Sequence, residues 1–170
     1  PVLLAITRGF GDALRIGTQE RPDIFARQIV LPWPLYAQVL EITERVSASG
    51  DVLQPLDEAA ARAGLRAAYH TGLRSVAIVL MHGWRFTAHE AALARIAGDV
   101  GFTQISVSHR VAPLVKLIAR GDTSVVDAYL SPVLHRYVAG LEAGLGPAVR
   151  ALYMQSSGGL ISAETARREP

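Results

Sequence analysis

Short apolar runs are the feature of this sequence that most constrains its fold. Val2–Ile6 is continuously apolar, as is Ser75–Leu80 after its first residue, and both are of strand length, which indicates strands buried on both faces. Thr103–Val107 is a further strand. Because segments with helical signals alternate with these strands, the sequence predicts an α/β fold with a layered sheet.

Capping residues mark the first of these helices. Asp57 precedes a segment with apolar positions at Leu65 and Tyr69, and Gly72 is suited to end it. Asp57 and Glu58 are better explained as negative charge at a helix N-terminus than as an acid–base pair.

The segment Thr87-Ala-His-Glu90 has the form of a capping box, in which the Thr87 and Glu90 side chains each bond a backbone amide at the helix start. The helix that follows ends near Gly101. Its apolar side consists of Leu93, Ile96 and Val100. A strand, this helix and the strand at 103–107 together form a βαβ unit.

Other segments complete the predicted organisation. Val39–Val46 mixes β-branched and charged residues, which is typical of a half-exposed strand, and residues 47–51 close it as a turn. Residues 17–35, with three prolines, are an irregular excursion. A long helix covers Thr123–Leu145, and Pro132 either starts or kinks it. Val149–Met154 is a last buried strand, and Ser162 opens a final helix.

Composition excludes several classes of protein. The net charge of the 170 residues is only +2, and the 17 basic residues are scattered rather than gathered on one face, which argues against nucleic-acid binding. No apolar run approaches the roughly 20 residues of a membrane span. Cysteine is absent, which excludes disulfides and thiol chemistry in these residues. We expect a cytoplasmic protein.

Three turns offer candidate ligand contacts. The first, after the strand at residues 2–6, contains Thr7, Arg8, Gly9 and Asp12. Ligands of open α/β sheets bind at the carboxyl ends of strands, where this turn belongs. A purely structural turn is the alternative.

The second is Arg120-Gly-Asp-Thr123, ahead of the long helix. Arg120 and Thr123 either contact a carboxylate or phosphate at the helix start, or they are a solvated arginine and a cap. Asp127 lies one turn along and either faces the same site or favours the helix dipole.

The third is Met154-Gln-Ser-Ser-Gly-Gly-Leu160, between a strand and a helix. Backbone amides at such a turn can cradle an anion, with hydroxyl donors from Ser156 and Ser157 and close approach at Gly158 and Gly159. The alternative is an ordinary tight turn. The segment lacks the Gly-Lys-Ser/Thr of a Walker A loop.

The histidines do not define a metal site. His82 and His89 are separated by a strand-to-helix turn, and no acidic or cysteine set stands near them at standard ligand spacing. A serine hydrolase is also unsupported, because no Gly-x-Ser-x-Gly elbow occurs.

Taken together, Ile6–Asp12, Leu80–Trp84, Arg120–Pro132 and Leu152–Leu160 resemble the ATP-dependent 5-oxoprolinase family, also called hydantoinase/oxoprolinase. Residues 16–21 and 39–46 add to the resemblance. Family segments similar to 154–160 carry aspartate where Ser157 stands, so an acidic role there is not implied. The Ile118–Thr123 segment is closer to oxoprolinase proper than to the shorter hydantoinase A chains.

The resemblance implies an actin/sugar-kinase-like (ribonuclease H-like) architecture and opening of 5-oxo-L-proline to L-glutamate with ATP and Mg²⁺, as in glutathione metabolism. It implies an internal piece of a longer enzyme, with residues 1–115 from an N-terminal domain and 116–170 opening the hydantoinase A domain. The family's glycine-rich phosphate segments lie outside these residues, so we expect the piece to be inactive alone.

The implied partners are a lactam, ATP, and the rest of the parent chain or a hydantoinase B-type region; a homodimer is a further expectation. No nucleic acid or membrane is expected. Two alternatives stay open. One is a hydantoinase A or N-methylhydantoinase-like subunit, which opens a different ring. The other is a non-catalytic scaffolding domain, which binds a partner subunit but no nucleotide.

Overall fold

The computed structural model describes residues 1–18, 25–28, 31–146, 149, 151–155 and 158–168, and side chains as far as residue 165. These residues form two compact units, Pro1–Ala128 and Tyr129–Pro170. Among the described helices, none is both long and apolar enough to cross a membrane.

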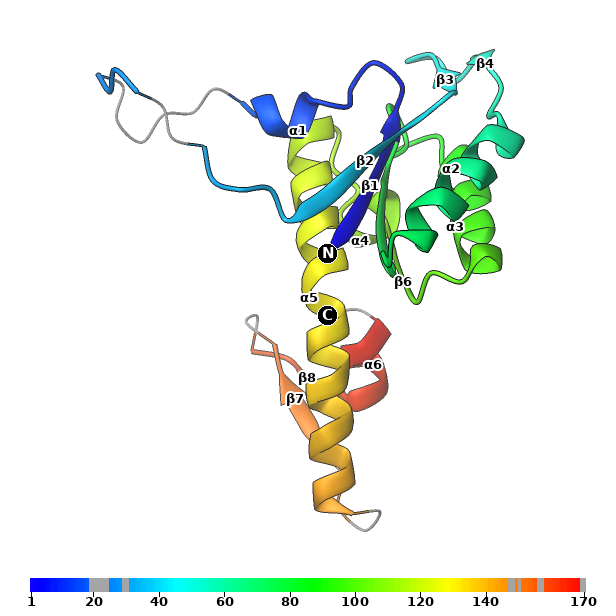
Figure 1. The fold of residues 1–170 in the computed structure, drawn as a ribbon. Coiled ribbons are helices and arrows are strands. Elements are labelled where there is room, and N and C mark those ends of the chain that lie inside the picture. The colour runs from blue at the N-terminus through cyan, green and yellow to red at the C-terminus, as the bar shows by residue number, and fades with distance from the viewer. Residues whose placement is uncertain (19–24, 29–30, 147–148, 150, 156–157, 169–170) are drawn as a thin grey trace. The chain divides into compact units, whose positions relative to one another are not determined.

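A four-stranded parallel sheet organises the first unit (Figure 1). Its order is β2 (Tyr36–Ile42), β1 (Val2–Thr7), β5 (Ser75–Val79) and β6 (Gln104–Val107). Every residue of β1 is buried, because this central strand is covered on both faces. The strands predicted at 2–6, 75–80 and 103–107 are confirmed.

Helices cover both faces of this sheet. Alternate residues of β1 point to opposite sides, so Leu3 and Ala5 pack with α2 (Glu58–His70) and α3 (Ala88–Val100). Leu4 and Ile6 pack instead with Val125 and Ala128 of α5. The layered α/β arrangement predicted from the alternating pattern is therefore present.

The helix ends follow the predicted capping residues for α2. The Asp57 carboxylate accepts a hydrogen bond from the Ala60 amide at 2.9 Å, and Gly72 has a left-handed φ of +96° just past the helix. The predicted βαβ unit is also confirmed, since α3 joins the parallel strands β5 and β6 and ends at Gly101.

The capping box predicted at residues 87–90 is wrong. Thr87 is the N-cap residue of α3, but its side chain makes no cap hydrogen bond. Glu90 is fully buried and accepts from donors at the ends of β5 and β6. A buried carboxylate needs several donors, and these strand ends supply more of them than the single cap amide.

The strand predicted at 39–46 is interrupted. β2 begins earlier, at Tyr36, and ends at Ile42, after which β3 (Arg45–Val46) pairs antiparallel with β4 (Val52–Gln54). The turn predicted at 47–51 is confirmed, with the Ser47 amide bonded to the Asp51 carbonyl at 2.9 Å. Two single-turn helices, α1 (Ala13–Ile16) and α4 (Ser108–Val111), carried no sequence signal.

The long helix α5 spans Leu117–Leu145, with Pro132 inside it rather than at its start. It begins before the Arg120–Thr123 segment, so the prediction that this segment lies ahead of the helix is wrong. The Thr123 and Ser124 hydroxyls donate to the carbonyls of Ala119 and Arg120, 2.9 and 2.7 Å away, and thus bond the preceding turn instead of capping a new one.

In the second unit, β7 (Leu152–Met154) and β8 (Leu160–Ser162) form an antiparallel hairpin, followed by α6 (Ala163–Arg168). The strand predicted at 149–154 is present only over β7, and its predicted burial is wrong, since Met154 is 75% exposed and the hairpin is separate from the four-stranded sheet. The glycine turn precedes a strand rather than a helix. The helix predicted to open at Ser162 is confirmed, because the Ser162 hydroxyl accepts from the Thr165 amide at 3.2 Å.

Candidate functional site

Buried polar side chains gather at the carboxyl edge of the parallel sheet. Strands β1, β5 and β6 end near Thr7, Leu80 and Ser108, and parallel strands bring these ends to one edge. The side chains involved are at most 1% exposed: Thr7, Glu44, Glu90, Ser108 and Arg120. Polar groups this deeply buried require hydrogen-bond partners. Their hydrogen bonds form two networks, one around Glu44 and one around Glu90.

The first network is built on Glu44, which follows β2. One carboxylate oxygen accepts from the Thr7 hydroxyl at 2.5 Å, and the other is bonded to Nδ1 of His89 at 2.8 Å. The Thr7 oxygen in turn accepts from the Met81 amide at 2.8 Å. Three segments, the ends of β1 and β5 and the start of α3, are therefore tied to one carboxylate.

The second network is built on Glu90. Its Oε1 accepts from the Leu80 amide at 2.8 Å and the Ser108 hydroxyl at 2.6 Å. Its Oε2 accepts from the His109 amide at 3.2 Å and is bonded to His109 Nδ1 at 2.6 Å. Four donors from the ends of β5 and β6 converge on this side chain, which joins the two strand ends.

Arg120 is the cation of the second network. Its guanidinium donates to the Ser108 hydroxyl at 2.8 Å, to the Leu114 carbonyl at 2.8 Å, and to the Leu80 carbonyl. Burial lowers the pKa of Arg120, and the negative charge of Glu90 opposes this shift. Arg120 is thus held inside the protein rather than presented at a helix start.

The structure brings two predicted site residues, Thr7 and Arg120, to this edge, where they bond the consecutive residues Met81 and Leu80. Thr123 lies on α5 and bonds its own helix. Asp127 accepts from the Ser106 hydroxyl of β6 at 2.5 Å. Asp127 therefore bonds the end of β6, and Thr123 bonds a carbonyl of its own helix.

The turn after β1 has its amides engaged internally. Glu41 accepts from the amides of Gly9 and Gly11 at 2.9 and 3.2 Å. Arg45 donates to the Arg8 carbonyl at 2.9 Å. Asp12 is the N-cap residue of α1 without a side-chain cap bond. The Glu41 carboxylate thus already binds the amides of the turn where the sequence suggested an external ligand.

The glycine turn of the second unit is a hairpin turn. The Gly158 amide donates to the Gln155 carbonyl at 2.9 Å, and the Gln155 amide donates to the Gly159 carbonyl at 2.8 Å. Gly158 has a φ of +85°, which explains the need for glycine. Ser156 and Ser157 lie outside the described residues.

Sequence reasoning missed the two carboxylate–histidine pairs. The sequence pattern assigns Glu90 to a capping box, and Glu44 falls in the predicted half-exposed strand at residues 39–46. One usable signal was the position of His89 and Glu90 shortly after a predicted buried strand. Residues in such a position can lie at the edge of the sheet where ligands bind. His82, in the same connection, has a left-handed φ of 59°, which is strained for a residue other than glycine.

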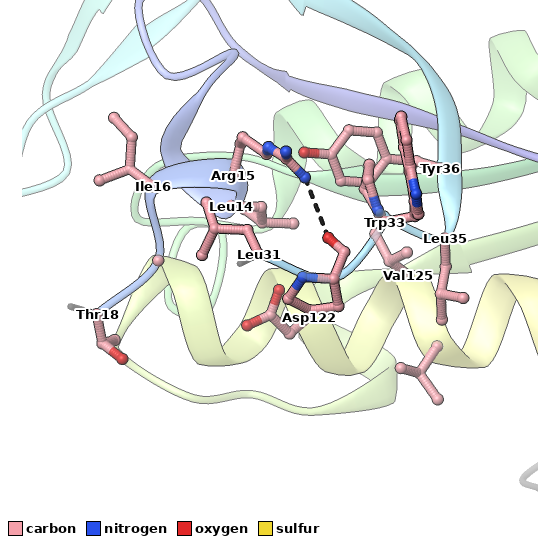
Figure 2. Close-up of a pocket in the computed structure, with 14 residues that line it drawn as sticks. Leu14, Arg15, Ile16, Thr18, Leu31, Trp33, Leu35, Tyr36, Asp122 and Val125 are labelled. Carbon is pink, nitrogen blue, oxygen red and sulfur yellow. Dashed lines mark hydrogen bonds between the residues drawn. The ribbon is translucent and has the colours of Figure 1, made fainter. Parts of the chain in front are cut away.

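A separate cavity of about 600 Å³ lies between α1, the segment before β2, and α5 (Figure 2). Its lining is mostly apolar and includes Leu14, Trp33 and Val125. Arg15 donates to the Pro32 carbonyl at 3.0 Å across one side. Burial raises the pKa of the Asp122 carboxyl, which lines the same cavity.

Comparison with solved structures defines the class of the protein. The chain superposes on the crystal structure of the ATP-dependent caprolactamase from Pseudomonas jessenii with a TM-score of 0.80 and 30% identity, covering 95% of this chain and 25% of that one. Nucleotide-free acetone carboxylase gives a TM-score of 0.74 over 96% of this chain and 26% of that chain; at 20% identity it shows the fold alone. The predicted actin-like α/β architecture is confirmed.

Residues 1–101 match the hydantoinase/oxoprolinase N-terminal region, and residues 120–170 match the hydantoinase/oxoprolinase model. The chain belongs to the hydantoinase/oxoprolinase family, as the resemblance indicated.

Named relatives include the 5-oxoprolinase of Saccharomyces cerevisiae, 36% identical over 91% of this chain, and 5-oxoprolinase 1 of Arabidopsis thaliana, 36% identical over 94%. The chain spans 14% of the length of each of these curated relatives.

Proposed function

We propose that this chain is part of an ATP-dependent cyclic amide hydrolase of the 5-oxoprolinase type, which opens 5-oxo-L-proline to L-glutamate. The observation that carries the proposal is the network of His89 with the buried Thr7 and Glu44 at the carboxyl edge of the sheet, in a chain similar to proteins named 5-oxoprolinase. Such an edge is where α/β proteins bind small molecules. The similarity supplies the substrate class.

The chemistry explains the use of ATP. An unstrained five-membered lactam is a poor electrophile, and phosphorylation of its carbonyl oxygen provides a leaving group. Catalysis of such a reaction depends mainly on positioning and on stabilisation of charge.

The described residues do not fit a protein-built Mg²⁺ site. They contain no group of three histidine, cysteine, aspartate or glutamate side chains able to hold a metal ion. Both buried carboxylates, Glu44 and Glu90, already accept hydrogen bonds from protein donors. We therefore assign no metal-dependent step to these residues.

This chain would then form one wall of a cleft that other parts of the parent enzyme complete. Residues 1–115 would belong to its N-terminal domain and 116–170 to its hydantoinase A domain, and the site would lie in the cytoplasm. The amides of Gly9 and Gly11 are occupied by Glu41, which supports the expectation that phosphate contacts come from elsewhere.

The test is phosphate release by the purified parent enzyme with ATP and each of three rings: 5-oxoproline, hydantoin and caprolactam. The proposal predicts that 5-oxoproline gives the highest kcat/KM. Preference for a hydantoin would favour the hydantoinase-like alternative, and release with none of the three would favour a scaffolding role. The 170-residue chain alone is the control, and it should show no lactam-dependent release.

A further inference from the structure

We propose that His89 is the residue that transfers protons during ring opening, and that Glu44 is its positioning residue. The inference rests on the proposed function, because the proton transfer belongs to the lactam reaction. It assigns a role to His89, which belongs to none of the candidate turns or glycine-rich segments.

The geometry supports one tautomer of the imidazole. Glu44 is 1% exposed, and its Oε2 lies 2.8 Å from Nδ1 of His89. Carboxylate oxygens accept hydrogen bonds, so we assign the tautomer in which Nδ1 donates to Glu44 and Nε2 carries the free lone pair. The His89 side chain is 15% exposed, so it is neither locked in the core nor freely solvated.

The carboxylate is itself held in place. Its second oxygen accepts from the Thr7 hydroxyl at 2.5 Å, and the Thr7 oxygen accepts from the Met81 amide at 2.8 Å. A histidine backed by a carboxylate that is oriented by a third group is the arrangement of a general base. Glu44 thus sets the tautomer and orientation of the ring.

The location favours a reacting group. Thr7 ends β1, Glu44 follows β2 and His89 lies in the first turn of α3, so the pair sits at the carboxyl edge of the sheet. His82, in the connection that bonds Thr7 through Met81, has a φ of 59°. Strain of this kind in a residue other than glycine is concentrated at functional sites.

The neighbouring pair, Glu90 and His109, lacks this arrangement. Glu90 accepts hydrogen bonds from four donors, and two of these bonds come from His109. The backbone amide and the ring nitrogen of His109 both bond Oε2 of Glu90. Removal of the His109 ring therefore leaves three of the bonds to Glu90 in place. His109 serves as the matched control, because its side chain is 14% exposed and also bonds a buried glutamate.

Ring opening moves one proton in each direction. The step begins with the lactam phosphorylated on its carbonyl oxygen. The oxygen of the attacking water forms a bond to that carbonyl carbon while one of its protons passes to Nε2 of His89. As the carbon–nitrogen bond of the ring breaks, its electron pair stays on the departing nitrogen, which takes the same proton from Nε2. The carbon keeps the phosphorylated oxygen as an acyl phosphate, and a second water hydrolyses it to the open-chain acid and phosphate. The imidazole is thereby returned to its starting state.

The test uses the full-length parent enzyme with the variants His89→Ala, His89→Gln, Glu44→Gln and His109→Gln. Loss of a general base lowers turnover by about 10²- to 10⁴-fold. We expect that loss in kcat for both His89 variants, with KM for the lactam changed less than about threefold. Added imidazole should restore part of the activity of His89→Ala and none of that of His89→Gln, in which the space is filled. His109→Gln should retain most of kcat.

The outcomes separate the two proposals. A wild-type enzyme that opens 5-oxoproline, together with His89→Gln at wild-type kcat, overturns the role of His89 and leaves the proposed function intact. A wild-type enzyme that opens no lactam overturns both. If the His89 variants fail to fold, Glu44→Gln decides: kcat reduced at least about tenfold at unchanged KM supports the proposal, and unchanged kcat contradicts it.

Discussion

Two carboxylate–histidine pairs lie at one edge of the same sheet, and they differ in the number of hydrogen bonds that each carboxylate accepts. Glu90 accepts hydrogen bonds from four donors at the ends of two strands. One of these donors, the Ser108 hydroxyl, also accepts a hydrogen bond from Arg120. Glu44 accepts from one hydroxyl and one imidazole. The same pair of side chains can therefore be a structural junction in one place and a site suited to proton transfer in another.

The largest expected effect comes from the cation of the junction. Arg120→Met removes every donor of a fully buried guanidinium and leaves Ser108, the Leu80 carbonyl and Glu90 without it. Breaking a buried ionic network in this way costs about 3–5 kcal/mol. Urea unfolding measures the loss, and a change below about 1 kcal/mol would show that Arg120 is not structural.

The next prediction compares the two carboxylates directly. Glu90→Gln should lower the free energy of unfolding by about 3 kcal/mol, and Glu44→Gln by about half as much, because hydrogen bonds to charged groups contribute roughly 1.5–3 kcal/mol and Glu90 makes more of them. The order should reverse for lactam turnover, where Glu44→Gln has the larger effect. Equal stability losses would contradict the distinction between the two pairs.

Gly83 tests how tightly the junction is packed. A Cβ at Gly83 would lie 3.0 Å from the Leu80 carbonyl oxygen and would overlap the Glu90 carboxylate. Gly83→Ala should therefore cost about 1–3 kcal/mol by overpacking.

Gly98 of α3 provides the matched control, since the nearest atom to an added Cβ there is 3.9 Å away. Gly98→Ala should stabilise the helix by about 0.5–1 kcal/mol. Thermal unfolding of both variants checks the pair, and a stabilised Gly83→Ala protein would refute the packing.

The smallest effect belongs to the apolar cavity, away from both pairs. Burial raises the pKa of Asp122, so the folded state favours the neutral carboxyl and stability from this group is lost as pH rises through the folded pKa. Asp122→Asn should remove this loss and make the protein slightly more stable than wild type at pH 7. The advantage should disappear in acid, below the pKa of the unfolded state. Unfolding in urea at both pH values measures it.

The fold was predictable where its signals were local. Val2–Ile6 reads as a buried strand because five adjacent apolar residues suit no other short element, and Asp57 caps α2 through an amide three residues away. The start of α5 was not predictable in this way. Hydroxyls at Thr123 and Ser124 are typical of helix starts, yet here they bond carbonyls of a helix that began earlier.

The candidate site was harder to predict than the fold. Thr7 was found because glycine and polar residues follow a strand there, and Arg120 because its segment has the residue types of a helix start, although it lies inside α5. The partners of Thr7 are Glu44, 37 residues away, and Met81, 74 residues away. The sequence around Glu44 has the partial alternation of an exposed strand, and nothing local distinguishes it from a solvated side chain.

By itself, the sequence determined the α/β class, strands β1, β5 and β6, the ends of α2 and α3, and the resemblance that the family match confirms. These depend on periodicity, capping and short motifs, which act over a few residues. Only the tertiary structure decided which charges are buried and which histidine each glutamate holds. An unpaired buried charge is so unfavourable that Glu44 and Glu90 must bond donors that the fold places beside them. Several of these donors are distant in the sequence, so the residues next to each glutamate do not predict them.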